Sequence, residues 1–227
     1  MAWSLSYNRR WFNSGIGSEI MLLVGLTGSI GMGKSTTASM FKEYNYSIYN
    51  VDDTVHYVYE NDQIVIEKID KVFPGSSIDG KVNRIFLRDE LNKNPKKFRD
   101  LEAIIHPAIR QYQITFIKKK IEEGKLGCIL DIPLLFETGG EKYVDTAVVV
   151  IASEKKQYER VVEGRSVPIE VFNQIRSQQM PDQEKIKKAN FVISTNDNLE
   201  KTKKEVEKIV NKISFLEPKA WNIYYNK

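Results

Sequence analysis

The chain has 227 residues and a formal net charge of +4, with 41% hydrophobic and 28% charged residues. These values are typical of an ordinary globular protein, and no apolar run approaches the roughly twenty residues that a membrane span requires. No basic stretch with interleaved aromatic residues is present, which disfavours nucleic-acid binding, and one cysteine excludes a disulfide framework. We expect one structural domain with insertions, in the cytoplasm, without nucleic-acid or membrane partners.

Residues 1–20 follow no clear hydrophobic period, although they include Trp3 and Trp11. Met21 stands where the first apolar run begins, so we expect residues 1–20 to be a disordered N-terminal extension or to precede the natural start. A transit segment is a weaker alternative.

The apolar run 21–27 predicts a buried parallel strand, and residues from Ser35 onward can continue as a helix. Between them, Gly28 is followed after four residues by Gly33-Lys34-Ser35, the Walker A spacing. Glycines let the backbone approach an anion closely, Lys34 supplies a charge for the β- and γ-phosphates, and the Ser35 hydroxyl can ligate Mg²⁺. The loop predicts binding of a nucleoside triphosphate.

Four further β-rich runs follow, with helical stretches between them. Strands that alternate with helices imply a parallel sheet with right-handed crossovers. We therefore expect an α/β fold with a five-stranded, doubly wound nucleotide-binding core, its later strands at 47–51, 128–132, 146–151 and 191–194.

Three helical stretches complete the predicted elements. The interval 61–125 contains no convincing strand and is expected to be a helical insertion, within which His106-Pro107 opens a helix. A polar helical stretch at 153–179 interrupts the core. The last helix, 199–213, has an apolar face and a lysine-rich face.

Carboxylates follow two of the predicted strands. Asp52 and Asp53 come after the second strand, at the edge of the sheet where open α/β folds bind ligands. One of them can accept a proton from an acceptor hydroxyl, and one can instead cap the helix that begins near Thr54. Asp131 ends the third strand, where a metal and its water shell would be held. Glu137 serves the same cleft or caps the next turn.

The remaining polar candidates are weaker. His56 and His106 lack a second histidine or cysteine at metal-ligand spacing, so no zinc site is expected. Arg160 and Arg165 lie in the polar helical stretch. A mobile lid could bring these guanidinium groups over the phosphates, or both could be exposed helix charges, and the sequence favours neither.

Taken together, these segments resemble the dephospho-coenzyme A kinase family over most of the chain from Met21 to about Ile213. The runs at 131–137 and 101–107 are far more particular than the Walker A loop. The segments that carry the resemblance are 25–36 (GLTGSIGMGKST), 51–53 (VDD), 55–56 (VH), 101–107 (LEAIIHP), 131–137 (DIPLLFE), 179–181 (QMP) and 184–185 (EK).

The resemblance implies a P-loop kinase core at 21–60, 128–152 and 190–227, a helical acceptor domain at 61–127 and a lid at 153–189. It implies transfer of a phosphoryl group from ATP to the ribose 3′-hydroxyl of dephospho-coenzyme A, with Mg²⁺, in a monomer or weak homo-oligomer. The site residues it implies are Asp52, Lys34 and Arg160 for catalysis; Gly28, Gly31, Met32, Gly33, Lys34, Ser35 and Thr36 for ATP; Asp52, His106, Pro133 and Leu134 for the acceptor; and Ser35 and Asp131 for the metal.

Two positions depart from the family pattern. The family usually has Asp-x-Asp after the second strand, whereas Asn50 stands at the first position here. The family often repeats an arginine four residues after the position of Arg160, but Gly164 stands there and Arg165 follows. One residue turns a helical side chain by about 100°, so Arg165 reaches the phosphates only if the local backbone differs.

Three alternatives are weighed against this function. Another P-loop kinase of nucleosides or nucleotides would differ in its acceptor insertion. A GTP-driven switch is disfavoured because the chain lacks an Asn-Lys-x-Asp motif. The departures at Asn50 and Gly164 leave room for a catalytically silent nucleotide binder.

Overall fold

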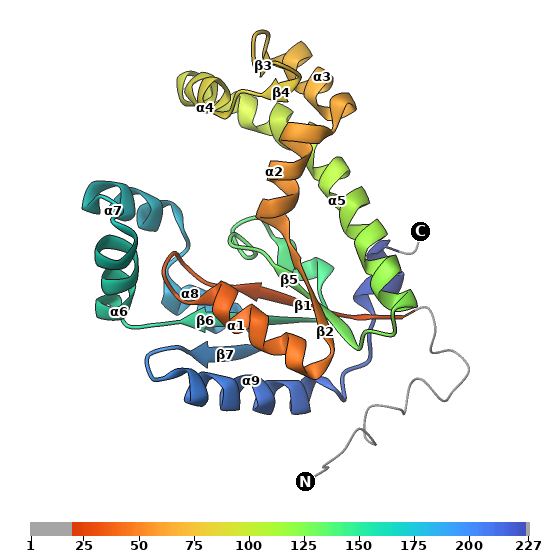
Figure 1. The fold of residues 1–227 in the computed structure, drawn as a ribbon, viewed down its shortest axis with the longest axis vertical. Coiled ribbons are helices and arrows are strands. Elements are labelled where there is room, and N and C mark those ends of the chain that lie inside the picture. The colour runs from red at the N-terminus through yellow and green to blue at the C-terminus, as the bar shows by residue number, and fades with distance from the viewer. Residues whose placement is uncertain (1–19, 226–227) are drawn as a thin grey trace. The chain divides into compact units, whose positions relative to one another are not determined.

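The computed structural model describes residues 20–225, so the predicted extension at 1–20 lies almost entirely outside the described residues. A five-stranded parallel sheet in the order β2-β5-β1-β6-β7 forms the centre of the fold (Figure 1). Every predicted strand is confirmed to within a residue or two. The strands are β1 (Leu22–Thr27), β2 (Tyr46–Asn50), β5 (Gly127–Asp131), β6 (Thr146–Ile151) and β7 (Phe191–Ser194).

The chain forms two compact units. The core unit comprises the described residues up to 49 and from 117, and the helical unit comprises residues 50–116. The predicted last helix is confirmed at residues 199–213, as α9. The helices of the core unit are α1 (Lys34–Met40), η2 (Phe41–Tyr44), η4 (Gly140–Tyr143), α6 (Glu154–Tyr158), the π-helix η5 (Glu159–Glu163), α7 (Ile169–Gln178), α8 (Asp182–Lys188), α9 (Leu199–Ile213) and the π-helix η6 (Trp221–Tyr225).

Alternating side chains of the strands build the core on one face of the sheet. Leu22, Val24 and Leu26 of β1 point to the same face because successive strand residues alternate sides. They pack with Val206 and Ile209 of α9, and α9 also contacts α1. A second cluster, around Leu135, Phe136 and Ala147, includes Met180 and Ala189 at its edge. The sheet is therefore covered as a nucleotide-binding α/β core requires.

The helical unit has a hydrophobic core of its own, formed by residues such as Val58, Ile69, Leu87 and Leu101. Asn or Asp side chains cap three of its helices by accepting a backbone N–H. Its elements are α2 (Val51–Asn61), α3 (Gln63–Val72), β3 (Ser77–Ile78), β4 (Lys81–Val82), α4 (Arg84–Lys93), η3 (Pro95–Lys97) and α5 (Phe98–Glu122), of which the residues from Ile117 on belong to the core unit.

The interval 61–125 was predicted to contain no strand, and this is wrong for a short antiparallel hairpin, β3 and β4. Asp79 and Gly80 form its turn with positive φ values of 51° and 72°. Asp-Gly is the dipeptide that two-residue hairpin turns favour, so the signal was present in the sequence. Each strand has only two residues, too few to produce an alternating pattern.

The prediction that His106-Pro107 opens a helix is also wrong, because Pro107 lies inside α5. The helix begins at Phe98, nine residues earlier in the chain. Proline in a helix interior removes one backbone hydrogen bond, a local cost that the rest of a 25-residue helix can offset. The proline therefore did not mark a boundary here.

The helical unit, 50–116, differs at both ends from the acceptor domain predicted at 61–127. It begins earlier because α2 starts directly where β2 ends, and it ends earlier because α5 passes into the core unit at Ile117. The assignment of acceptor and lid roles to these regions stays a prediction.

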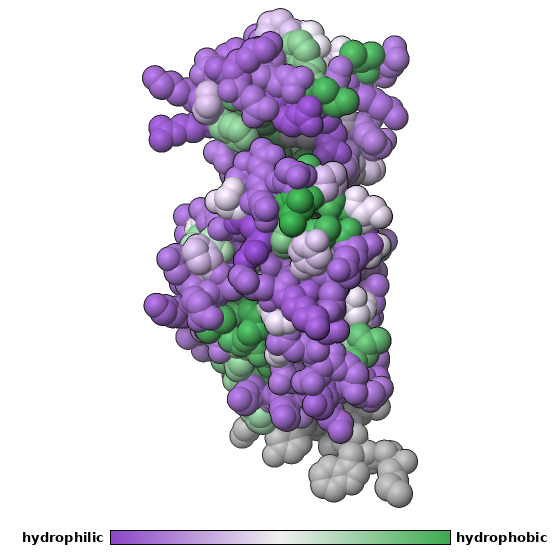
Figure 2. Space-filling model, turned by 90° about the vertical axis from the view of Figure 1, so that its left-hand side faces the viewer, coloured by the Kyte–Doolittle hydropathy of each residue, from purple (hydrophilic) through white to green (hydrophobic). Residues whose placement is uncertain are grey.

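Within residues 20–225, no helix is both long enough and apolar enough to cross a membrane. The face of the molecule in Figure 2 is mainly hydrophilic, with separate hydrophobic groups.

Candidate active site

A glycine-rich loop connects β1 to α1. Gly33 is the N-cap of α1 and has a left-handed backbone with φ 84°. Gly31 has φ 78°, and a Cβ atom there would lie 2.5 Å from Cγ2 of Val161. Both positions therefore require glycine. Gly33 has no side chain to cap α1, and the first N–H groups of a helix are where anions commonly bind.

Lys34 and Asp131 are brought together in the core unit. Lys34 Nζ forms an ion pair with Asp131 Oδ1, and these side chains are 15% and 3% exposed. The register of the sheet explains this contact, because Asp131 at the end of β5 lies opposite Leu26, just before the loop. Ser35 follows Lys34 in the first turn of α1 and is exposed. Two predicted metal ligands thus lie on elements that meet at the loop.

Three side chains hold the backbone carbonyls of the loop. Gln157 Nε2 donates to the carbonyl of Ile30 at 2.6 Å. Thr195 Oγ1 donates to the carbonyl of Met32 at 2.8 Å, and an Arg160 guanidinium nitrogen donates to the carbonyl of Gly31 at 3.2 Å. Gln157 and Thr195 were missed by the sequence reasoning, because no motif marks either residue.

Arg160 also donates to the Thr195 side chain at 2.9 Å and to its carbonyl oxygen at 2.7 Å. The guanidinium is therefore fixed beside the loop. Arg165 is exposed at the end of the same helical stretch.

The backbone between Arg160 and Arg165 departs from an α-helix. Residues Glu159–Glu163 form a π-helix, and the N–H of Gly164 donates to the carbonyl of Glu159, five residues earlier. In a π-turn the residue at i+5 takes the place that i+4 has in an α-helix. The backbone before Arg165 therefore differs from an α-helix by this one turn. Whether Arg165 reaches the phosphates stays a prediction.

Asp52 and Asp53 occupy the first turn of α2 in the helical unit. The expected alternative, that one of them caps the helix, is wrong: the cap is Asn50, whose side chain accepts the N–H of Asp53 at 3.2 Å. The residue that departs from the family pattern therefore takes the capping role. Both carboxylates are exposed, and acidic groups in a first helical turn are stabilised by the helix dipole.

His56 lies four residues after Asp52, on the same face of α2. A guanidinium nitrogen of Arg84 lies 2.9 Å from Nδ1 of His56. Arg84 was missed by the sequence reasoning; its position directly after the Asn83 cap of α4 gave no signal. His106 is exposed on α5.

Pro133 and Leu134 follow β5 in the core unit. The carbonyl of Pro133 accepts the Thr27 hydroxyl at 3.0 Å, which ties this segment to the end of β1. Leu134 is 43% exposed. Glu137 accepts the N–H of Met180 at 2.8 Å and pairs with Lys185 at 3.0 Å. Within residues 20–225, no three His, Cys, Asp or Glu side chains gather as a metal cluster.

The sheet order, the glycine-rich loop and the lysine at its end define a P-loop kinase-type α/β protein. A family model described as dephospho-CoA kinase matches residues 22–201. The chain belongs to the dephospho-CoA kinase family.

Curated relatives agree with this assignment. A dephospho-CoA kinase from Rhodopseudomonas palustris is 42% identical over 190 residues, covering 84% of this chain and 94% of the relative. One from Agrobacterium fabrum is 42% identical over 194 residues, covering 86% and 99%. Among solved structures, the protein TT1252 from Thermus thermophilus superposes with a TM-score of 0.76 at 26% identity, covering 86% of this chain and 98% of that one.

Proposed function

We propose that the chain transfers the γ-phosphoryl group of ATP to the ribose 3′-hydroxyl of dephospho-coenzyme A, giving coenzyme A and ADP. The match of the family model over residues 22–201 carries this proposal. The phosphate loop with Lys34 and Asp131 supplies the donor half of such a kinase.

On the donor side, we expect the backbone at Gly28 and at residues 31–36 to bind the phosphates of ATP. Lys34 is held by Asp131 in this structure, so its charge is already at the loop. When ATP binds, we expect Lys34 to turn from Asp131 to the β- and γ-phosphates. Arg160 supports the same loop through the Gly31 carbonyl and adds positive charge beside it.

We propose that Mg²⁺ is held by Ser35 and Asp131. A hydroxyl and a carboxylate are the hard oxygen donors that this ion prefers, and both residues lie at the loop. Bound there, Mg²⁺ would neutralise charge that develops on the phosphate oxygens. With the ion bound, Asp131 would contact the metal or its water in place of Lys34.

On the acceptor side, we propose Asp52 as the general base. Its carboxylate takes the proton of the 3′-hydroxyl while that oxygen bonds to the γ-phosphorus and the bond to the ADP oxygen breaks. His106, Pro133 and Leu134 stay proposed acceptor contacts. Arg84, paired with His56 one turn from Asp52, adds a cation suited to the phosphates of the acceptor.

We further propose that the protein acts in the cytoplasm as a monomer or weak homo-oligomer. The thiol of Cys128 is buried, and burial raises its pKa to about 12, as suits a reduced, inert cysteine.

A screen of acceptors tests this function. With Mg²⁺ and ATP, we expect ADP release with dephospho-coenzyme A. We expect none above background with AMP, adenosine or other nucleosides. The Lys34→Ala variant is the control, because it should lose most activity. Phosphorylation of nucleosides without dephospho-coenzyme A would favour another P-loop small-molecule kinase.

A further inference from the structure

Residues 179–182 connect α7 to the first residue of α8 and contact the first half of the phosphate loop. We call them the clamp segment. Gln179 Oε1 accepts the backbone N–H of Ile30 at 3.1 Å. Asp182 Oδ1 accepts the hydroxyl of Ser29 at 2.6 Å. Two consecutive loop residues are thus bonded to one segment about 150 positions later in the chain.

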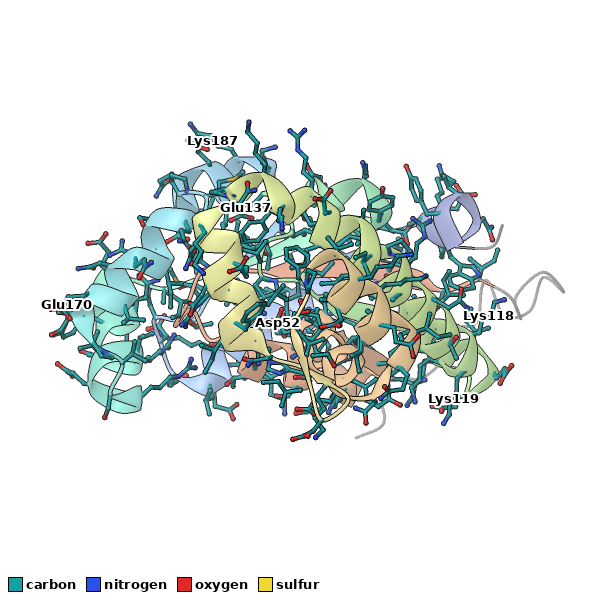
Figure 3. The ribbon with its side chains drawn as sticks, turned by 90° about the horizontal axis from the view of Figure 1, so that it is seen from above. Asp52, Lys118, Lys119, Glu137, Glu170 and Lys187 are labelled. Atoms are coloured by element: carbon teal, nitrogen blue, oxygen red, sulfur yellow. The ribbon has the colours of Figure 1, made fainter. Side chains whose placement is uncertain are left out.

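The clamp segment is anchored from behind by a buried ion pair. Lys185 of α8 is fully buried, and its Nζ lies 3.0 Å from Glu137 Oε1. The same Glu137 oxygen accepts the N–H of Met180 inside the clamp segment. Figure 3 labels Glu137 close to α8, whereas Lys187 of the same helix points away from the protein. Glu137 therefore joins α8 and the clamp segment to the loop after β5.

These contacts act on the shape of the loop. A phosphate loop must hold its N–H groups in one arrangement, and an unsupported glycine-rich loop loses conformational freedom when a ligand binds. When side chains fix Ser29 and Ile30 in the folded protein, the loop loses this freedom during folding and not when the ligand binds. The Ile30 N–H thus already has Gln179 as its acceptor before a ligand binds.

We propose that Gln179 and Asp182 are positioning residues that preorganise the phosphate loop for ATP, and that the buried Lys185–Glu137 pair holds them in place. This inference rests on the proposed function only in taking ATP as the ligand of the loop.

The dissociation constant of a non-hydrolysable ATP analogue with Mg²⁺, measured by calorimetry, tests the proposal. We expect Asp182→Ala to raise it about tenfold, since a hydrogen bond to a charged group is lost. Asp182→Asn should restore binding to nearly the original value, because the amide oxygen still accepts from Ser29. The KM for the acceptor should stay nearly unchanged in both variants.

A double-mutant cycle makes the assignment specific. Ser29→Ala should weaken analogue binding about as much as Asp182→Ala, and the double variant should be no weaker than either one. Lys187→Ala, an exposed change on α8, is the matched control and should bind normally. If Asp182→Ala fails to fold, Ser29→Ala alone breaks the same bond and takes its place.

Normal analogue binding by Ser29→Ala and Asp182→Ala would overturn the proposal, as would fully additive effects in the double variant. Failure of the proposed function would look different: the protein would bind the analogue, with the clamp variants weakened, yet would not phosphorylate dephospho-coenzyme A.

Discussion

At the residue scale, the Asn50 cap changes the interpretation of the two aspartates in the first turn of α2. Because its side chain caps the helix, neither Asp52 nor Asp53 is needed for capping. The two carboxylates follow each other in a helix and so point about 100° apart. Asp52 and Asp53 lie four and three residues before His56, so both are within one turn of this side chain, which contacts Arg84. The proposal that Asp52 and not Asp53 is the base is therefore tested by comparing variants of the two residues.

We predict that Asp52→Asn lowers kcat about a hundredfold while the dissociation constant of ATP stays nearly unchanged, the size expected for loss of general-base help. Steady-state kinetics with dephospho-coenzyme A, together with calorimetry for ATP, measure both. The neighbouring change Asp53→Asn is the control and should retain most of kcat. Equal losses in the two variants would argue against the assignment.

The sequence predicts the phosphate loop well because its function requires particular residue types at fixed spacing. The residues that hold the loop in place were not predictable in this way. Gln157 and Thr195 contact it across 127 and 163 positions of the chain, and a glutamine or threonine at such a distance has no local pattern. Only the fold brings these side chains to the loop carbonyls.

At the element scale, the π-helix at Glu159–Glu163 offers a structural explanation for the one extra residue between Arg160 and Arg165. A π-turn commonly accommodates one extra residue inside a helix and is frequent at functional sites. Arg165 then follows Arg160 by one turn of the actual backbone. We therefore expect the two guanidinium groups to lie closer to one helical face than five residues of an α-helix would place them.

We predict that Arg165→Ala lowers kcat about tenfold, because a cation available to the transferring phosphoryl group is lost. Deletion of Gly164 should convert the π-turn to an α-turn and keep most of the activity. Glu163→Ala, an exposed change in the same turn, is the control. Unchanged kcat in Arg165→Ala would assign this arginine to the exposed helix surface.

We predict how the buried ion pair between Lys185 of α8 and Glu137, in the loop after β5, affects stability. Lys185→Met leaves Glu137 without its counter-charge and should lower the free energy of unfolding by about 3 kcal/mol. Adding Glu137→Gln, which keeps an acceptor for the Met180 N–H, should recover most of the loss. Urea denaturation followed by circular dichroism measures both. A double variant as unstable as the single one would contradict this.

Elements were predictable where their periodic pattern was long. The five core strands and α9 combine buried runs or a clear apolar face, so their limits were close to those observed. The two-residue strands β3 and β4 were too short for a pattern, and Pro107 was taken as a boundary although α5 runs through it. A single proline is a weak boundary signal when a long helix surrounds it.

At the scale of the whole molecule, the sheet order explains why the chemistry gathers after β1. Strand β1 lies in the middle, with β5 on one side and β6 on the other. Crossovers that leave to opposite sides open a crevice at the carboxyl ends of the central strands, where α/β folds bind ligands. The phosphate loop and Asp131 both follow strands at this edge.

The helical unit is inserted between β2 and β5 and has its own hydrophobic core and helix caps. Asp52 is the second residue of α2, two positions after the end of β2, so in the sequence the proposed base lies near the junction between nucleotide core and insertion. We predict that a kinase built in this way obtains its donor site from the common fold and its acceptor specificity from the insertion.

The identity of the product tests the central claim most directly. Purified protein is incubated with Mg²⁺, ATP and dephospho-coenzyme A, and phosphorus NMR follows the reaction. We predict ADP and, in equal amount, a new phosphate monoester on the 3′-oxygen of the ribose, identical to authentic coenzyme A. ADP with free phosphate in place of this ester, or an ester at another position, would contradict the account.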